Sequence, residues 1–476
     1  MKVVSLSASP LIHVMFCAVG GGGDLALALS TTKILQSYGF RVCLIENSIS
    51  FFSAQNLYYP VTDVLSKLKS SYSDIPIFTY ETVPDSCKNP CFAICLPVIQ
   101  NERMWAHICK KTSLYGVRVP ILPIQMNCDN FFLPEGALAL GFGMDARGRK
   151  SIGLCFKPSD AEPPTHETFL RSQPFDLEKL DNEWLKSRLS DDVNSKALLF
   201  IYNHLHFNSV RELLVMLSAL SKDSRDVAAV LKTYDYSDKD QIPMSLLRSY
   251  DFDLKFFDQL AWYVEILSGL GISKVVFSSP GQEDREFEVS ISGKTVYLLD
   301  PFPLSSQDFA TLSESSIAVA GCTGLNSFTD AISSRKLPLY EVLWENRKLW
   351  ADFCVEAKQC DPENSGLSKY FELLESLVKL VPFGGIKLLP YLSSGVRPSG
   401  YRDQIPAGVA GDDSSVESIR NARESILQIG EILRFPEVWS QWQKFSDYLI
   451  NERNANKYIL AILTSYLQVS LAERRD

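Results

Sequence analysis

The sequence contains few of the residues that build metal sites. Five histidines occur in 476 residues, and no pair of cysteines or histidines has a CxxC or HxxxH spacing. Zinc sites in proteins usually draw their ligands from such closely spaced pairs. The sequence therefore predicts no bound metal at such a site, and it gives no indication of a metal-dependent chemistry.

An excess of basic residues is also absent. Lysine and arginine number 47 against 56 aspartates and glutamates, which gives a net charge of −9 at pH 7. Proteins that bind a nucleic-acid backbone need a clustered basic face that displaces counterions. We therefore expect no nucleic-acid partner, although a local basic pocket remains possible.

Long apolar runs are lacking too. No stretch approaches the roughly 20 apolar residues of a membrane-spanning helix, and residues 1–10 carry one lysine without the apolar core of a signal peptide. The eleven cysteines are odd in number, and Cys17, Cys43 and Cys95 stand singly in apolar segments. Free buried thiols fit a reducing compartment. These features predict a cytoplasmic protein without a membrane span.

The length and composition are those of a large globular protein. Apolar residues make up 46% and charged residues 22% of the chain, as in ordinary globular domains. A chain of 476 residues exceeds the size at which a single hydrophobic core stops growing. We therefore expect two domains with a helical appendage.

Strands and helices alternate in two blocks. The first block has expected strands at 11–19, 41–45, 75–80, 91–97 and 119–126, with helices at 24–38 and 102–115. After a proline-rich break at 157–192, the second has expected strands at 196–202, 227–234, 272–278, 295–299, 317–320 and 337–340, with helices at 210–221, 259–270, 307–313 and 325–334. Continuous apolar strands separated by helices indicate parallel sheets covered on both faces.

This pattern predicts an α/β fold of two tandem Rossmann-like domains with a helical C-terminal tail. We expect a first domain with its linker over residues 1–190 and a second domain over 191–350. Residues 351–476 should form the mainly helical tail.

A glycine run stands at the expected start of the first helix. Gly20, Gly21, Gly22 and Gly23 lead directly into Asp24. Glycines let the backbone approach a ligand closely, and a helix N-terminus favours negative charge. The spacing matches neither the dinucleotide fingerprint nor the P-loop. Asp24 either caps the helix or removes a proton from an acceptor group, and both alternatives stay open.

A second small-residue segment follows the expected strand at 317–320. Its small and polar residues are Gly321, Thr323, Gly324, Asn326 and Ser327. Hydroxyl, amide and backbone N–H groups at the start of a helix suit an anion. Asp330, about one helical turn further along, could bond ribose hydroxyls. A plain capped turn is the alternative.

Four more side chains are candidates for the cleft between the domains. His204 and His206 follow the first expected strand of the second domain, at an edge where α/β proteins place ligands. They could contact a diphosphate, or one could be exposed and the other packed in the core. Arg147 and Arg149 lie in a turn-rich segment and either bind a phosphate or are simply solvated.

These motifs resemble those of GT-B glycosyltransferases, which consist of two Rossmann-like domains. Within that fold the pattern is similar to the protein-arginine rhamnosyltransferases. Those enzymes open with an Asp-Asn-Phe-Gly-Asp-Ile-Gly loop, similar to residues 20–26. They also have an aromatic-Pro segment with Gln and Asp-Tyr ahead of a Gly-Glu-Asp-Ser-Phe loop, which is similar to the segment from Phe302 to Phe328.

The resemblance implies an inverting transfer of a hexosyl or deoxyhexosyl group from a nucleotide-sugar to an acceptor. It implies that the domain over residues 1–190 lies on the acceptor side and that the domain over 191–350 binds the nucleotide-sugar. A protein side chain, arginine in that family, is the candidate acceptor, and the only small-molecule partner is the donor substrate, with no cofactor. Asp24 would be the catalytic residue. The implied donor-binding residues are Phe302, Gln307, Asp308, Gly321, Thr323, Gly324, Asn326, Ser327 and Asp330.

The chain departs from that family at three carboxylate positions. Gly20 stands at the first aspartate of the first loop, and Leu325 and Asn326 stand at the glutamate and aspartate of the donor loop. A catalytically silent GT-B scaffold that binds proteins is therefore one alternative. A nucleotide-sugar epimerase is another, although it requires several acid and base residues in its cleft.

Overall fold

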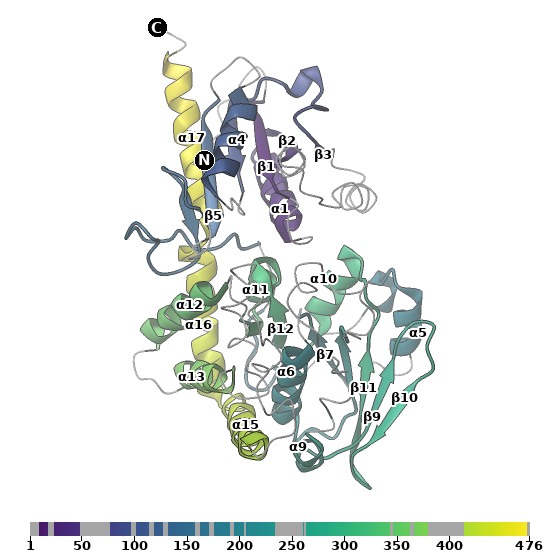
Figure 1. Cartoon of the computed structure of the whole chain (residues 1–476). Coiled ribbons are helices and arrows are strands. Elements are labelled where there is room, and N and C mark those ends of the chain that lie inside the picture. Colours follow the sequence, from purple (N-terminus) through teal and green to yellow (C-terminus); the bar gives the residue numbers. More distant parts are fainter. Residues whose placement is uncertain are drawn as a thin grey trace, which may run out of the picture. The chain divides into compact units, whose positions relative to one another are not determined.

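The computed structural model of the chain (Figure 1) divides into two compact units. The first unit contains Met1–Lys157, Ala351–Phe353 and Leu449–Asp476, and the second contains Pro158–Trp350 and Cys354–Tyr448. The structure describes residues 9–17, 23–47, 77–96, 101–113, 119–126, 132–157, 162–170, 176–190, 195–203, 206–233, 260, 263–342, 346–361, 366–378 and 414–473.

The first unit is built on a six-stranded sheet in the order β3-β2-β1-β4-β5-β6. Neighbouring strands pair in parallel. The strands are β1 (Leu11–Phe16), β2 (Arg41–Glu46), β3 (Ile77–Phe78), β4 (Phe92–Cys95), β5 (Ile121–Met126) and β6 (Leu138–Leu140). The order reverses between β1 and β4, which is the topological switch point of this sheet.

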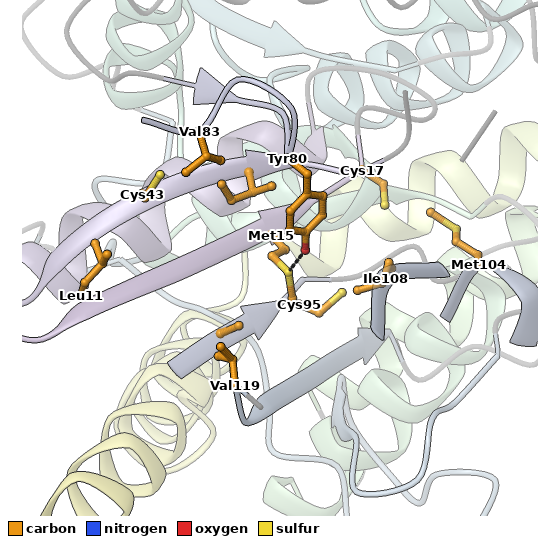
Figure 2. Packing of buried hydrophobic residues seen from close by; sticks show 12 residues of the cluster. Leu11, Met15, Cys17, Cys43, Tyr80, Val83, Cys95, Met104, Ile108 and Val119 are labelled. Atoms are coloured by element: carbon orange, nitrogen blue, oxygen red, sulfur yellow. Dashed lines mark hydrogen bonds between the residues drawn. The ribbon is translucent and has the colours of Figure 1, made fainter. Parts of the chain in front are cut away.

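Sulfur-containing side chains fill much of the core on this sheet (Figure 2). Figure 2 shows Tyr80 among them, and its hydroxyl donates a hydrogen bond to Met15 Sδ at 2.7 Å. Cys17, Cys43 and Cys95 are buried free thiols, so the expectation for these three residues is confirmed. Burial raises the pKa of Cys95 to about 12, which keeps its thiol neutral at physiological pH.

Helices α1 (Gly23–Ser37), α4 (Glu102–Ser113) and α17 (Ala455–Glu473) lie in the first unit. Helix α1 contacts β1, β2 and α17. A short 3₁₀ helix, η1 (Asp85–Cys87), precedes β4. The chain therefore returns to the first unit at its C-terminal helix.

The second unit is built on a seven-stranded sheet in the order β10-β9-β11-β8-β7-β12-β13. Strand β10 is antiparallel to β9, and the other neighbours pair in parallel. The strands are β7 (Ala197–Ile201), β8 (Val227–Leu231), β9 (Ile272–Ser278), β10 (Arg285–Glu288), β11 (Lys294–Leu299), β12 (Val319–Thr323) and β13 (Leu337–Glu341). The switch point lies between β7 and β12.

Helices surround this sheet and continue along the C-terminal part of the chain. They are η2 (Leu177–Lys179), α5 (Glu183–Ser190), α6 (His206–Ala219), α9 (Val264–Gly269), α10 (Ser306–Ser315), α11 (Gly324–Ser333), α12 (Arg347–Cys360), α13 (Leu367–Val378), α15 (Ser414–Ile432) and α16 (Pro436–Glu452). Helix α6 is buried along most of its length because it contacts β7 on one side and α15 on another.

The expected fold class, two tandem Rossmann-like α/β domains with a helical C-terminal segment, is confirmed. Strand β9 coincides with the expected 272–278, whereas β6 and β10 were not expected. Strand β6 has three residues, and β10 reads REFE with mostly exposed side chains, so neither has an apolar periodicity. The domain boundaries expected near residues 190 and 350 remain predictions.

Candidate functional site

The strongest candidate site lies at the carboxyl edge of the second sheet. Strands β7 and β12 are neighbours there, with Gly321 opposite Ile201. The backbone N–H of Tyr202 donates to the carbonyl oxygen of Gly321 at 3.1 Å. Open α/β sheets bind ligands outside the carboxyl ends of their strands at the switch point. The segment expected to bind the donor therefore begins at this edge.

Helix α11 begins directly where β12 ends. Thr323 is the extended N-cap residue, and Gly324 has a φ of 63° in the left-handed region. A Cβ at residue 324 would meet nothing within 4 Å, so the backbone conformation and not the space favours glycine. The first N–H groups of an α-helix have no acceptor within the helix. The first turn of α11 can therefore bind an anion.

The hydroxyl of Thr323 is buried without a partner. Thr323 is 4% exposed, and its Oγ1 has no hydrogen-bond partner among the described residues. It makes no capping bond to α11. Leaving a buried hydroxyl unsatisfied costs about 1–3 kcal/mol, and such groups usually bond to a ligand or an ordered water. This hydroxyl is therefore a candidate hydrogen-bond donor to a ligand at the first turn of α11.

Ser327 shapes the same turn. Its Oγ accepts a hydrogen bond from the Thr323 N–H at 2.9 Å and donates one to the Thr323 carbonyl oxygen. The side chain of Ser327 thus fastens the end of β12 to α11. Asn326 and Asp330 are partly exposed on this helix, and the Asn326 carbonyl oxygen accepts from Thr329 Oγ1 at 2.8 Å.

Gly321 does not lie in a loop, as the sequence predicted, but inside β12. A Cβ at this position would lie 2.3 Å from Glu212 Oε2 and 2.8 Å from a side-chain carbon of Ile201. Glycine is therefore needed because α6 and β7 pack directly against the strand. The strand expected at 317–320 ends before Gly321, whereas β12 continues to Thr323. The reason is that small residues in a tightly packed strand look like a loop in the sequence.

A buried polar network that the sequence did not reveal surrounds this strand end. Arg211 Nη2 lies 3.1 Å from Glu212 Oε1, and both side chains are almost fully buried. Asn208 Nδ2 donates to Oε1 of Glu341, the last residue of β13, at 2.9 Å. Burial raises the pKa of Glu212 well above its usual range, and nearby Glu341 adds to this effect while Arg211 opposes it.

One sequence signal could have indicated this network. Asn208, Arg211 and Glu212 stand in the first half of a helix whose second half is mostly apolar. Such polar residues on a buried helix require partners. Their partner Glu341 is remote in sequence, however, so its identity could not be inferred.

The segment after β11 carries three expected donor residues with different environments. The Phe302 ring is partly buried and stacks on Tyr202, with ring centroids 5.9 Å apart. Gln307 is exposed and donates to Thr311 Oγ1 at 3.2 Å. Asp308 is buried as part of the capping box of α10, with Ser305 as its partner.

The carboxylate of Asp308 is also engaged outside its helix. Its Oδ1 accepts from the backbone N–H of Asp181 at 2.7 Å and from that of Asn182 at 3.2 Å. These bonds hold the segment before α5 against the start of α10. We therefore assign Asp308 a structural role and leave it out of the proposed donor contacts.

In the first unit, Asp24 is the second residue of α1, which follows the switch-point strand β1. Arg149 pairs with the buried Asp145 at 2.8 Å and donates to the Ala137 carbonyl oxygen at 2.9 Å. Arg147 donates to the Leu133 carbonyl oxygen. Both arginines are exposed, and the choice between phosphate binding and simple solvation stays a prediction.

Several expected site residues cannot be placed. Gly20, Gly21, Gly22 and His204 lie outside the described residues. Gly23 and Asp24 open α1 and His206 opens α6, but their side chains are outside the description. The expected roles of these residues stay predictions.

In the described part of the chain, no group of three or more His, Cys, Asp or Glu side chains could hold a metal ion. None of its helices is both long and apolar enough to cross a membrane.

No protein-family model and no curated protein sequence matches the chain. Among solved structures, an alpha-glucosyltransferase in complex with UDP and a 13-mer DNA aligns with a TM-score of 0.37 and 9% identity over 88% of this chain and 96% of its own. MurG from Acinetobacter baumannii aligns with a TM-score of 0.32 and 13% identity over 83% and 98%. The spinosyn rhamnosyltransferase SpnG aligns with a TM-score of 0.34 and 9% identity over 95% and 99%.

These alignments have TM-scores below 0.5, so we draw no conclusion about this chain from them. The resemblance to protein-arginine rhamnosyltransferases stays a hypothesis.

Proposed function

We propose that this chain is a glycosyltransferase that binds a nucleotide-sugar at the carboxyl edge of its second sheet. The observation that carries the proposal is the first turn of α11, which begins at the switch point beside the buried, unpartnered hydroxyl of Thr323. Backbone N–H groups, a hydroxyl donor and the positive end of the helix dipole suit a diphosphate. The same groups would stabilise the diphosphate as it leaves, without a metal ion.

The rest of the donor would extend from the diphosphate along the strand ends. Asp330 lies on α11 and is partly exposed, so its carboxylate can accept hydrogen bonds from ribose hydroxyls. Phe302 and Tyr202 form an aromatic pair at the same edge. A partly exposed aromatic ring offers a nucleobase a stacking surface.

Asp24 is the proposed base on the acceptor side. The acceptor nucleophile attacks the anomeric carbon from the face opposite the diphosphate, so its configuration inverts. The bond from that carbon to the phosphate oxygen breaks, and the nucleoside diphosphate leaves with the electron pair. Asp24 takes the proton of the nucleophile, and its place at a helix N-terminus favours the ionised form.

The acceptor that we propose is a protein side chain, following the family resemblance, and the compartment is the cytoplasm. The transferred group would be a hexosyl or deoxyhexosyl unit. The donor is consumed as a substrate, so no cofactor takes part in the proposed reaction.

Ligand binding tests this proposal. The full chain is titrated by calorimetry with UDP, TDP, GDP and ADP and with their glucose or rhamnose conjugates. Thr323→Val should weaken binding of the preferred nucleotide about tenfold, because it removes one hydrogen bond to a charged group. Thr329→Val is the matched control, since its hydroxyl bonds to the Asn326 carbonyl oxygen. A wild type that binds none of these ligands would overturn the proposal.

A further inference from the structure

Asp300 joins two loops at the carboxyl edge of the second sheet. Its Oδ2 accepts from the Thr233 N–H at 2.8 Å and from the Thr233 hydroxyl at 2.7 Å. Its Oδ1 accepts from the Phe302 N–H at 3.3 Å. Asp300 directly follows β11, and Thr233 lies just beyond the end of β8, the neighbouring parallel strand. One carboxylate therefore connects the loop after β8 to the loop after β11.

Another aspartate connects the same two strands at their amino ends. Asp226 directly precedes β8, and its Oδ1 accepts from the backbone N–H of Thr295, the second residue of β11, at 2.8 Å. That bond joins the residue before β8 to the start of β11 and does not involve the loops at the carboxyl edge. The two aspartates therefore differ in their contact with Phe302, because only Asp300 accepts a hydrogen bond from its N–H.

Burial and the neighbouring groups act in opposite directions on the charged form of Asp300. Burial raises its pKa, whereas the bonds from Thr233 and Phe302 and the nearby Lys232 act in the opposite direction. A buried carboxylate is tolerated only when hydrogen bonds satisfy it. All three hydrogen bonds to the carboxylate come from residues of the two loops. The charged form of Asp300 therefore depends on the position of these loops, and the position of the loops depends on the carboxylate.

The loop held by Asp300 carries the aromatic ring of the proposed base site. Phe302 stacks on Tyr202, which directly follows β7 at the switch point. The Pro301 carbonyl oxygen accepts a longer bond, 3.4 Å, from Asn182. The Phe302 N–H bond to Asp300, at 3.3 Å, is thus one of two hydrogen bonds of similar length on the backbone of this loop.

We propose that Asp300 is a positioning residue that sets the place of Phe302 and so the binding of the base half of the nucleotide. The inference rests on the proposed function, because it requires a nucleotide at this edge. Asp300 does not touch the diphosphate in this arrangement. Its loss should therefore affect ligands with a base and spare ligands without one.

The test compares two ligands that differ only in the base. The affinities of the preferred nucleoside diphosphate and of ribose 5-diphosphate are measured by calorimetry for the wild type, Asp300→Asn and Asp226→Asn. In Asp300→Asn the remaining oxygen can still accept from Thr233, while the new amide would face the Phe302 N–H. We expect about a tenfold loss of affinity for the nucleoside diphosphate and an unchanged affinity for ribose 5-diphosphate. Asp226→Asn should change neither affinity.

Each other outcome overturns the inference. Equal losses for both ligands in Asp300→Asn, or equal effects of the two variants, would make Asp300 a general structural residue. If Asp300→Asn does not fold, Thr233→Val removes a single bond and should show the same selective loss, about threefold or more; an unselective effect would contradict the proposal. A wild type that binds neither ligand overturns the proposed function as well, whereas the other outcomes leave it standing.

Discussion

The two sheets reverse their strand order in the same way, but different residues stand at the two switch points. In the first sheet, β1 and β4 run into Cys17 and Leu96, which are apolar and buried. In the second, β12 ends at Thr323, and Asn203 lies just beyond β7; both are polar and buried. The shared topology therefore does not require polar residues at this edge.

This difference bears on function because buried polar groups reduce stability unless they are bonded. In the second sheet the network of Arg211, Glu212, Asn208 and Glu341 surrounds the strand end that leads into α11. Polar groups that a fold does not need are expected where a ligand is bound. In the first sheet, Glu46 and Asn47 at the end of β2 are also polar and buried, so the contrast holds for the ends of the switch-point strands and not for the whole edge.

Breaking the buried ion pair should give the largest effect. Arg211→Met leaves Glu212 without its cation in a buried site, so the free energy of unfolding should fall by about 3–5 kcal/mol. Chemical denaturation measures this change. The control is Arg188→Met, which removes the more exposed pair with Asp284 and should change stability by no more than about 1 kcal/mol. If both variants lowered the free energy of unfolding by similarly small amounts, the buried pair would not be needed for stability.

The proposed catalytic role of Asp24, which follows the first strand of the first sheet, is tested by Asp24→Asn. Removing the proposed base should lower turnover of the nucleotide-sugar roughly a hundredfold or more, while loss of a cap changes the free energy of unfolding by about 1 kcal/mol at most. Steady-state kinetics and denaturation are compared with Glu102→Gln. Glu102 opens α4, the helix after the other switch-point strand, and its substitution should leave turnover unchanged. Normal turnover in Asp24→Asn would make this residue a helix cap.

The tight packing of β12 is tested by Gly321→Ala. The added methyl group collides with Glu212 and Ile201, so the free energy of unfolding should fall by about 1–3 kcal/mol. Gly269→Ala is the control, because Gly269 is helical and its nearest contact for a Cβ is a side-chain nitrogen of Arg423 at 3.7 Å. That variant should gain about 0.5–1 kcal/mol. Denaturation curves in which both variants lose stability equally would contradict this account of β12.

The last prediction concerns pH, and its effect is small only over a single pH unit. Lys336 donates to the carbonyl oxygens of Ser316 and Ile317, and burial lowers its pKa to about 7. Because the unfolded chain binds this proton more tightly, the free energy of unfolding should rise with pH above 7, by about 1 kcal/mol between pH 7 and 8. The rise should end near the ordinary lysine pKa of about 10.4.

Lys336→Met should remove this dependence, which denaturation at a series of pH values would show. The buried thiols of the first unit, such as Cys95 with its raised pKa, act in the opposite direction above the ordinary cysteine pKa of about 8.5, because the unfolded chain then releases thiol protons that the folded chain keeps. The comparison is therefore made between pH 7 and 8. A flat profile in the wild type would mean that the carbonyl oxygens keep the Lys336 ammonium charged.

Local patterns were sufficient for much of the fold. The apolar runs at β1, β8 and β9 and the glycine between β12 and α11 can be recognised without knowing their partners. The end of β12 could not, because the small residues of a tightly packed strand look like a loop until Glu212 and Ile201 are brought against it. The expected donor residues could be distinguished from one another only in the folded structure. There Asp308 belongs to a capping box, whereas the hydroxyl of Thr323 is buried and has no hydrogen-bond partner.

The sequence by itself determined the alternation of strands and helices and hence the two Rossmann-like units, because hydrophobic periodicity and chain-turning residues act over a few neighbouring positions. Only the tertiary structure decided which polar groups meet at the carboxyl edge of the second sheet. Asn208 and Glu341 are 133 residues apart in the chain, and Thr233 and Asp300 are 67 apart. No local pattern in the sequence encodes such a pair, because the order of the strands in the folded sheet determines which residues meet.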